Sequence, residues 1–287
     1  MIKRELNFEG TSPLLYLIAT PIGNLDEMTP RALAILKEAD YLAAEDTRNS
    51  GKLMAHFGID KPWISCHEHN EQEAGERIVS LLLSGKKVCY MSDAGYPTLS
   101  DPGQRLVAKC LDNGIKVSVT SGPSAAIDAL ACSGLDSDHF YFQGFLSPKE
   151  SERANELRKL AARDETIIFY ESPHRITKTL VAMAAGLGDR RAVIARELTK
   201  AHEEFIRGTL SELALEPEES LRGEMVIIVE GKAKELDAEK SDNDIASALK
   251  AELDLGHSGK EAVKNVSANL GVAKNRVYTV YVESFKK

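Results

Sequence analysis

The segment that decides the fold is KVCYMSDAGYPTLSDPG, residues 87–103. Its apolar part, Val88-Cys89-Tyr90-Met91, ends abruptly in the small polar turn Ser92-Asp93-Ala94-Gly95. After a proline-containing loop, Asp101 and Pro102 predict a helix start, with Asp101 as N-cap and Pro102 in the first turn. A strand, a turn and a helix in this order are typical of open parallel sheets, which bind ligands outside the carboxyl ends of their strands. We therefore expect this turn to form the floor of a binding site.

The same alternation occurs on both sides of this segment. An apolar strand at residues 14–19 breaks into Thr20-Pro21-Ile22-Gly23-Asn24-Leu25, and a strand at residues 116–120 breaks into Ser121-Gly122-Pro123-Ser124-Ala125. Residues 134–138, with the sequence GLDSD, are typical of a joint between domains, and the alternation resumes after them. Strands that alternate with helices on both sides of a boundary near residue 130 predict two α/β domains.

The second half of the chain repeats the pattern. Strands are predicted at residues 139–145, 166–170, 192–195 and 225–229, and helices at residues 149–163, 173–185 and 210–215. Two of these strands end in polar residues, Glu171-Ser172-Pro173 and Arg196-Glu197, so both domains direct polar turns toward a ligand. The predicted fold is α/β, with an N-terminal domain over residues 12–125 and a second domain over residues 126–233.

Residues 241–287 have a different pattern. Apolar residues recur at helical spacing around Leu249, Val266 and Val277, and Gly271 marks a tight turn before the last stretch. The charge also changes sign here, because an acidic stretch precedes Gly256 and a basic one follows it. This pattern predicts a small helical tail with helix-turn-helix-like spacing, in which basic side chains are candidates for RNA contact.

Composition is that of an ordinary globular protein. The 287 residues are 43% hydrophobic and 28% charged. The sequence contains no apolar run of about 18 residues, and residues 1–9 lack the apolar core of a signal peptide, so we expect a cytoplasmic protein with no membrane segment. The net charge of −8 disfavours bulk electrostatic binding of nucleic acid. Any RNA contact must therefore be local.

Several familiar ligand motifs are absent. The first strand is not followed by Gly-x-Gly-x-x-Gly, and the chain has no Walker lysine motif and no Gly-x-Ser-x-Gly elbow. Cys66, His67 and His69 are close in sequence, but in a continuing strand Cys66 would point away from the two histidines, and a fourth ligand is missing. We expect no metal site, and we expect the four cysteines to be reduced.

A set of short motifs occurs in order along the chain: TPIGNL at residues 20–25, AEDTR at 44–48, HNE at 69–71, SDAG-x-P followed by DPG at 92–103, GPSA at 122–125, FYESPHR at 169–175, ARELTK at 195–200 and GEMV at 223–226. Their combination closely resembles the bacterial ribosomal RNA small-subunit methyltransferase I family, within the tetrapyrrole methylase superfamily. The resemblance spans residues 12–232 and continues more weakly into the tail. Tyr96 stands where relatives often carry Thr, a bulky change that is confined to the loop.

This resemblance implies a fold, a cofactor and an activity. The implied fold is two α/β domains of the tetrapyrrole methylase type, with the cofactor cleft between them. The implied activity is methyl transfer from S-adenosyl-L-methionine to the 2′-oxygen of a cytidine in the decoding (P-site) region of 16S rRNA, within the small ribosomal subunit, by a homodimer. Cofactor contacts are implied for Pro21, Ile22, Asp93, Ala94, Gly95, Ser124, Ala125, Tyr170, Glu197, and Glu224 or Met225.

A ribose hydroxyl is a poor nucleophile until its proton begins to leave, so a base is expected near the cleft. The candidate bases are Glu45, Asp46, His69 and Glu197, and the candidate substrate-binding residues are Arg48, Asn70, Arg175, Lys200, Lys274 and Arg276. Each candidate base also has a structural interpretation: helix caps for the first two, a loop hydrogen bond for the histidine, and an ion pair with Arg196 or Lys200 for the last. Alignment of the reacting groups without any base is a further alternative.

Two other functions remain open from the sequence. A methyltransferase acting on a tetrapyrrole or another small metabolite would use the same fold and cofactor, but it would need a deep apolar substrate trough and no basic tail. A ribosome-assembly factor that binds RNA without catalysis would not bind S-adenosylmethionine. Substrate panels and cofactor binding distinguish these functions.

Overall fold

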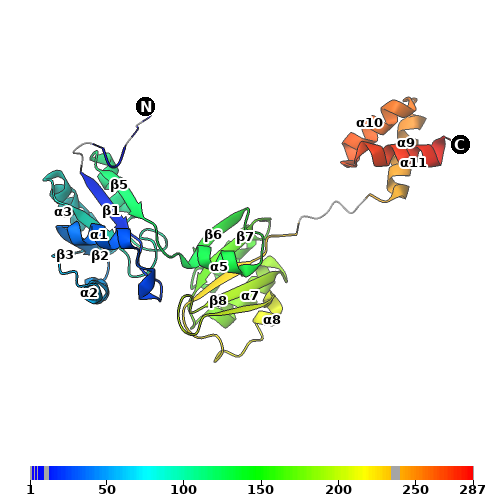
Figure 1. Ribbon diagram of the computed structural model, residues 1–287. Helices are drawn as coiled ribbons and strands as arrows, with labels where there is room; N and C mark the ends of the chain where they lie inside the picture. The colour runs from blue at the N-terminus through cyan, green and yellow to red at the C-terminus, as the bar shows by residue number, and fades with distance from the viewer. Residues whose placement is uncertain (1, 3, 5, 10–12, 234–239, 287) are drawn as a thin grey trace. The chain divides into compact units, whose positions relative to one another are not determined.

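The computed structural model describes residues 2, 4, 6–9, 13–233 and 240–286. The chain forms two compact units, Met1–Lys232 and Ala233–Lys287 (Figure 1). The described part of the larger unit contains two five-stranded sheets with helices against them, and that of the smaller unit is helical. The predicted α/β class with a helical C-terminal tail is confirmed.

The first sheet is entirely parallel. Its strands are β1 (Leu14–Ile18), β2 (Tyr41–Ala44), β3 (Trp63–Ser65), β4 (Val88–Met91) and β5 (Lys116–Thr120), in the order β3-β2-β4-β1-β5. All four residues of β4 are buried, as its continuous apolar run predicted. Because β1 and β4 are neighbours, the turns that follow them lie side by side at the carboxyl edge of the sheet.

Helices cover both faces of this sheet. They are the 3₁₀ turn η1 (Leu25–Glu27), α1 (Pro30–Glu38), α2 (Thr47–His56), α3 (Glu71–Leu83) and α4 (Gln104–Asp112). One face packs Leu36 of α1 and Met54 of α2 against the strands, and the other packs Ile78 of α3 and Leu106 of α4. This burial of both sheet faces explains why the strands are apolar throughout.

The start of α4 differs from the prediction. Asp101 is not its N-cap; the cap is Gly103, which has a φ of +119° and packs so closely on Tyr90 that a Cβ would lie 2.5 Å from the ring. The first amides of α4 are instead capped by Glu71, whose Oε1 accepts hydrogen bonds from the N–H groups of Gly103 (3.1 Å), Arg105 (3.2 Å) and Leu106 (3.4 Å). The carboxylate of Glu71, from α3, therefore caps α4 in place of Asp101.

The second sheet is mixed. Its strands are β6 (Phe140–Phe145), β7 (Thr166–Glu171), β8 (Arg191–Arg196), β9 (Glu204–Thr209) and β10 (Met225–Val229), in the order β6-β7-β10-β8-β9. Only β6 and β7 pair in parallel, because β10 runs antiparallel to both of its neighbours and β9 antiparallel to β8. Helices α6 (Glu150–Leu160), α7 (Ile176–Leu187) and α8 (Leu210–Leu213) pack on one face, and α5 (Ala125–Ser133) packs on the other.

Two elements of this half differ from the prediction. Strand β9 was not predicted, because it is an edge strand without strong apolar alternation. Helix α7 begins at Ile176 and not at residue 173, since Ser172, Pro173 and His174 form a turn and Arg175 is the N-cap. Neither difference changes which residues end the central strands of the sheet.

The smaller unit packs three helices around one apolar core. They are α9 (Asp242–Asp254), α10 (Gly259–Leu270) and α11 (Lys274–Phe285). Ser241 and Ser258 begin α9 and α10 with capping boxes, and Leu249, Val266 and Val277 are among the buried residues. None of the helices in the described part of the chain combines the length and the apolar character that crossing a bilayer requires.

Candidate active site

A cavity of about 420 Å³ lies in the larger unit, where loops that follow strands of both sheets meet. The first sheet contributes Ile22 after β1 and much of the loop at residues 94–101 after β4. The second sheet contributes residues at the carboxyl ends of β6, β7 and β8 and at the start of β10. The volume is within the range of about 300–1,000 Å³ that is usual for small-molecule sites. The predicted cleft between the two sheets is therefore present.

Backbone contacts fix the turns on the first-sheet side. Thr20 and Gly95 exchange two hydrogen bonds, each 3.0 Å long, which tie the turn after β1 to the turn after β4. The hydroxyl of Tyr96 accepts a hydrogen bond from the N–H of Gly122 (3.1 Å), which ties in the turn after β5. The unusual tyrosine therefore has a structural role. These contacts make one continuous wall from turns far apart in the sequence.

The backbone is strained beside the cavity. Among the described residues, the non-glycine residues with positive φ are Thr98 (75°), Ser100 (63°), Glu197 (51°) and Thr199 (66°). The first two are in the loop after β4, and the other two flank Leu198, which lines the cavity. Such conformations cost about 1–3 kcal/mol each and cluster at functional sites. The position of these strained residues beside the cavity points to it as a functional site, independently of the shape of the cavity.

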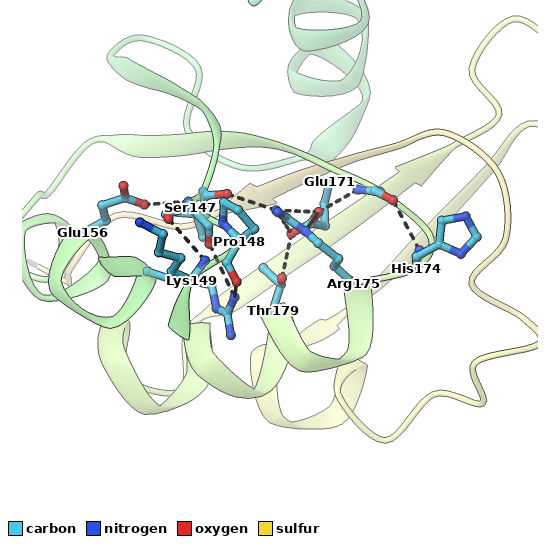
Figure 2. Close-up of polar contacts among 11 residues, drawn as sticks. Ser147, Pro148, Lys149, Glu156, Glu171, His174, Arg175 and Thr179 are labelled. Carbon is cyan, nitrogen blue, oxygen red and sulfur yellow. Dashed lines mark hydrogen bonds and ion pairs between the residues drawn. The ribbon is translucent and has the colours of Figure 1, made fainter. Parts of the chain in front are cut away.

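A buried ion pair fixes the second-sheet side (Figure 2). The side chain of Glu171 is 1% exposed, and its carboxylate accepts hydrogen bonds from Arg175 (3.0 and 3.1 Å), from the hydroxyl of Thr179 (2.6 Å) and from the N–H of Ser172 (2.7 Å). Arg175 also donates to the carbonyl of Leu146 (3.0 Å). The network therefore joins the loops that follow β6 and β7, with the charge of Glu171 neutralised.

A second network lies where β8 ends and β10 begins. Lys200 Nζ contacts the carboxylates of Glu197 (3.0 Å) and Glu224 (2.9 Å), and Glu197 also accepts a hydrogen bond from the N–H of Glu224 (3.0 Å). The backbone hydrogen bond from Glu224 and the nearby Lys200 hold the pKa of Glu197 below its usual value. Glu197 therefore holds two loops together and is a weak proton acceptor.

Asp101 has the opposite environment. It lines the cavity, and burial together with the negative charges of Glu45 and Asp93 raises its pKa to about 6, although a hydrogen bond from Ser92 opposes the shift. Tyr170 of the second sheet also lines the cavity, and its pKa is raised by burial and, to a smaller extent, by Asp101. The cavity thus contains a carboxyl group that titrates near neutral pH.

Comparison with known proteins shows the family. The model of the tetrapyrrole (corrin/porphyrin) methylases matches residues 14–214. The ribosomal RNA small subunit methyltransferase I of Bacillus subtilis (strain 168) is 44% identical over 288 residues, covering 98% of this chain and 99% of that protein. The protein of the same name from Haemophilus influenzae is 45% identical over 275 residues, covering 92% of this chain and 95% of its own. The chain belongs to the ribosomal RNA small subunit methyltransferase I family.

Solved structures of other methyltransferases have a similar fold. The methyltransferase CobJ aligns with a TM-score of 0.59 and 19% identity, covering 77% of this chain and 95% of that chain. The uroporphyrin-III-C-methyltransferase of Thermus thermophilus aligns with a TM-score of 0.54 and 17% identity, covering 76% of this chain and 94% of that chain. At these identities the likeness concerns the fold alone.

The cavity suits S-adenosylmethionine, the methyl donor that a methylase of this family implies. Phe145, Leu198 and Met225 supply apolar surface for an adenine ring, and the acidic lining suits a cationic sulfur. Helix α5 begins at the cavity, where the N–H of Ser124 already donates to Asp128 (3.2 Å) and that of Ala126 to Tyr170, so the positive end of the helix faces a bound carboxylate with only part of its first-turn donors. These features suit the adenine ring, the sulfonium and the carboxylate of the donor.

Many residues that the sequence analysis assigned to the cofactor line this one cavity: Ile22, Ala94, Gly95, Ser124, Ala125, Tyr170, Glu224 and Met225. Pro21, Asp93 and Glu197 are not part of its lining. Pro21 is buried beside Ile22, and Asp93 is exposed and accepts a hydrogen bond from Asn49 of α2 (3.3 Å). The cofactor contacts of the lining residues and of these three residues alike stay predictions.

The four candidate bases do not line the cavity. Asp46 is the N-cap of α2 and pairs with Arg48 (2.9 Å), whose hydrogen bonds lower its pKa to about 2, so it is a poor proton acceptor. Glu45, after β2, and His69, before α3, are exposed. Glu197 is engaged in the network with Lys200. For Asp46 and Glu197 the structural interpretation accounts for the contacts that we observe.

The predicted substrate-binding residues are dispersed. Arg175 and Lys200 are held in the two networks beside the cavity. Asn70 uses its side chain to fix its own loop, with bonds to the N–H of His67 (2.8 Å) and the carbonyl of Ser65 (3.0 Å). Arg48 is 87% exposed at the start of α2. Lys274 and Arg276 belong to the smaller unit, where Arg276 contacts Asp242 (3.3 Å) and Lys274 is exposed.

Sequence reasoning missed Asp101, Leu99 and Phe145 as cavity residues. Asp101 was interpreted as a helix cap because Asp-Pro commonly begins helices. The signal that could have identified Asp101 is its position in the sequence. The loop that contains it follows the turn at residues 92–95, which was already expected to contact a ligand. Phe145 ends an edge strand, and its exposed aromatic ring contacts Tyr170 with 5.6 Å between ring centroids.

Proposed function

We propose that this protein uses S-adenosylmethionine to methylate the 2′-oxygen of a cytidine ribose in the decoding region of 16S rRNA. The observation that carries the proposal is the near-full-length similarity to ribosomal RNA small subunit methyltransferase I, which includes the smaller unit. The two solved methyltransferases, one of which is a uroporphyrin-III-C-methyltransferase, cover only 76–77% of this chain. This difference favours a large RNA substrate over a small tetrapyrrole.

Different residues of the cavity make different contributions to binding. When bound, S-adenosylmethionine supplies an electrophilic methyl group on a positively charged sulfur. Apolar side chains such as Leu198 and Met225 exclude water from it, and the turns at residues 94–96 and 124–125 offer backbone groups. The Glu171–Arg175 pair fixes the loops on the second-sheet side. Catalysis then depends on alignment of the attacking oxygen and on removal of its proton.

The substrate side of the proposal involves groups at the surface. Exposed cations such as Arg48 and Lys274 are candidates for phosphate contacts, in line with local RNA binding by an acidic protein. We also propose that the substrate is 16S rRNA within the small subunit, that the protein acts as a homodimer, and that it works in the cytoplasm. Light scattering coupled to size-exclusion chromatography would measure the oligomeric state.

The direct test compares 16S rRNA from the parent strain and from a strain lacking this gene. We expect mass spectrometry to show the loss of one 2′-O-methyl group from a decoding-region cytidine. Purified protein should restore it in isolated small subunits with labelled S-adenosylmethionine. Unchanged rRNA, together with methylation of a tetrapyrrole panel, would replace the proposal with the small-molecule alternative. Failure to bind S-adenosylmethionine at all would favour a non-catalytic assembly factor.

A further inference from the structure

The carboxylates that line the cavity differ in their partners. Glu171 is saturated by Arg175, Thr179 and a backbone amide, and Glu224 pairs with Lys200. Within the described residues, no lysine, arginine or histidine forms an ion pair with Asp101, which accepts a hydrogen bond from Ser92. Asp101 is therefore the lining carboxylate that no cation neutralises.

Asp101 is also held firmly in position. Before it, the loop passes through the strained residues Thr98 and Ser100. After it, the hydroxyl of Tyr90 donates a hydrogen bond to the carbonyl of Pro102 (3.0 Å), and Glu71 fixes the N–H of Gly103. Groups that take part in chemistry need this kind of support, because a displacement of about 1 Å can cost 100-fold in rate.

The charges around Asp101 are mostly negative. The titratable or charged groups on the surrounding elements are Glu45 after β2, Asp93 after β4, Tyr90 of β4, Glu71 of α3, Tyr170 of β7, and Arg105 of α4, which is 82% exposed and turned toward Glu71. Burial and the two nearest acids make the ionised form of Asp101 less favourable. At neutral pH and above, the group is ionised and is more basic than an ordinary carboxylate.

We propose, on the premise that the protein methylates a ribose hydroxyl, that Asp101 is the catalytic base that accepts the hydroxyl proton. As the O–H bond breaks, the proton moves to an Oδ of Asp101. The oxygen electron pair forms the new bond to the methyl carbon, and the pair of the breaking carbon–sulfur bond stays on sulfur as a neutral thioether. Asp101 returns the proton to water once the products have left. No oxidant, reductant or metal is needed.

The test is single-turnover methylation of small subunits by D101N between pH 5 and 9, at saturating S-adenosylmethionine. We expect the rate constant at pH 8 to fall by at least about 100-fold, as is usual for loss of a general base. The wild-type rate should rise through about pH 6 and then level off, and D101N should lack this rise. D101E should recover part of the rate, because it retains a carboxylate.

Two measurements besides activity separate this role from a structural one. Calorimetry should give affinities for S-adenosylmethionine within about threefold of wild type in D101N, whereas a rate deficit explained by lost cofactor affinity would overturn the proposal. In protein with ¹³C-labelled aspartate, the resonance that disappears in D101N should titrate near pH 6. A midpoint at the ordinary aspartate value would also overturn it.

The matched control is D112N, which neutralises an exposed carboxylate at the other end of α4. We expect its rate and pH profile to match the wild type. Rates within threefold of wild type in D101N, with the same pH profile, would show that alignment alone drives the reaction. If the wild-type protein itself does not methylate small subunits, the proposed function fails, whereas a deficit or its absence in D101N tests the base alone.

Discussion

On the second-sheet wall of the cavity, Glu171 and Glu224 each contact a basic side chain, whereas on the first-sheet wall Asp101 lies near Glu45 and Asp93. The paired carboxylates hold loops in place through these contacts. Asp101, which lies near other acidic side chains, has a raised pKa and remains able to take a proton. One wall therefore provides rigidity and the other provides reactivity, although both are strand ends with acidic residues.

The largest effect should come from breaking the rigid wall. Arg175→Ala leaves the buried carboxylate of Glu171 without its cation, and loss of one partner of a buried pair costs about 3–5 kcal/mol. Urea unfolding should show this decrease in the free energy of unfolding. Arg191→Ala is the control, because its pair with Glu230 is exposed and should contribute at most about 1 kcal/mol. Equal losses in both variants would show that the network does not stabilise the wall.

A smaller loss is expected at the support of the reactive wall. Glu71→Ala removes the acceptor for three amides at the start of α4, and unsatisfied buried donors cost about 1–3 kcal/mol. Thermal unfolding would measure it. Glu76→Ala on the same helix removes only an exposed pair with Lys109 and should leave the melting temperature nearly unchanged. If Glu71→Ala were equally harmless, water would be capping α4 and not this carboxylate.

The smallest effect concerns the charge of Asp101 and depends on pH. Its folded-state pKa is raised, so the folded protein binds the proton more tightly than the unfolded chain does. The resulting destabilisation is absent at pH values below the unfolded pKa and complete above about pH 6. We expect D101N to raise the melting temperature at pH 8 by a few degrees, on the order of 1 kcal/mol, and to have little effect at pH 4.

For Asp46, which follows β2 of the same sheet, we expect the pH dependence of stability to have the opposite sign to that of Asp101. Its pKa is lowered to about 2, so its stabilising contribution is present above the unfolded pKa and disappears as the pH falls toward 2. Asp46→Asn should therefore lower the melting temperature at pH 8, where D101N raises it. Effects of the same sign in the two variants would mean that the two carboxylates do not differ as their contacts indicate.

Much of the fold could be predicted from local pattern. The buried β4 and the amphipathic helices around it followed from apolar periodicity, and so did the three helices of the smaller unit. Edge strand β9 was missed because its pairing with β8 compensates for a weak apolar pattern. The position of β10, antiparallel between β7 and β8, could not be predicted from local pattern either, because strand order depends on contacts across the whole sheet.

The same division holds for the site. Small residues after buried strands, such as Ala94 and Gly95, could be assigned to a ligand turn because strand ends in α/β sheets meet at one edge. The roles of the acids could not be assigned in this way, because a pKa depends on which charges the fold brings within a few ångströms. Glu71 caps α4 in place of Asp101. Arg48 and Lys200 form ion pairs with two of the candidate bases, Asp46 and Glu197. Residue order fixes where the turns occur, but the packing of distant elements sets the charge that each turn carries.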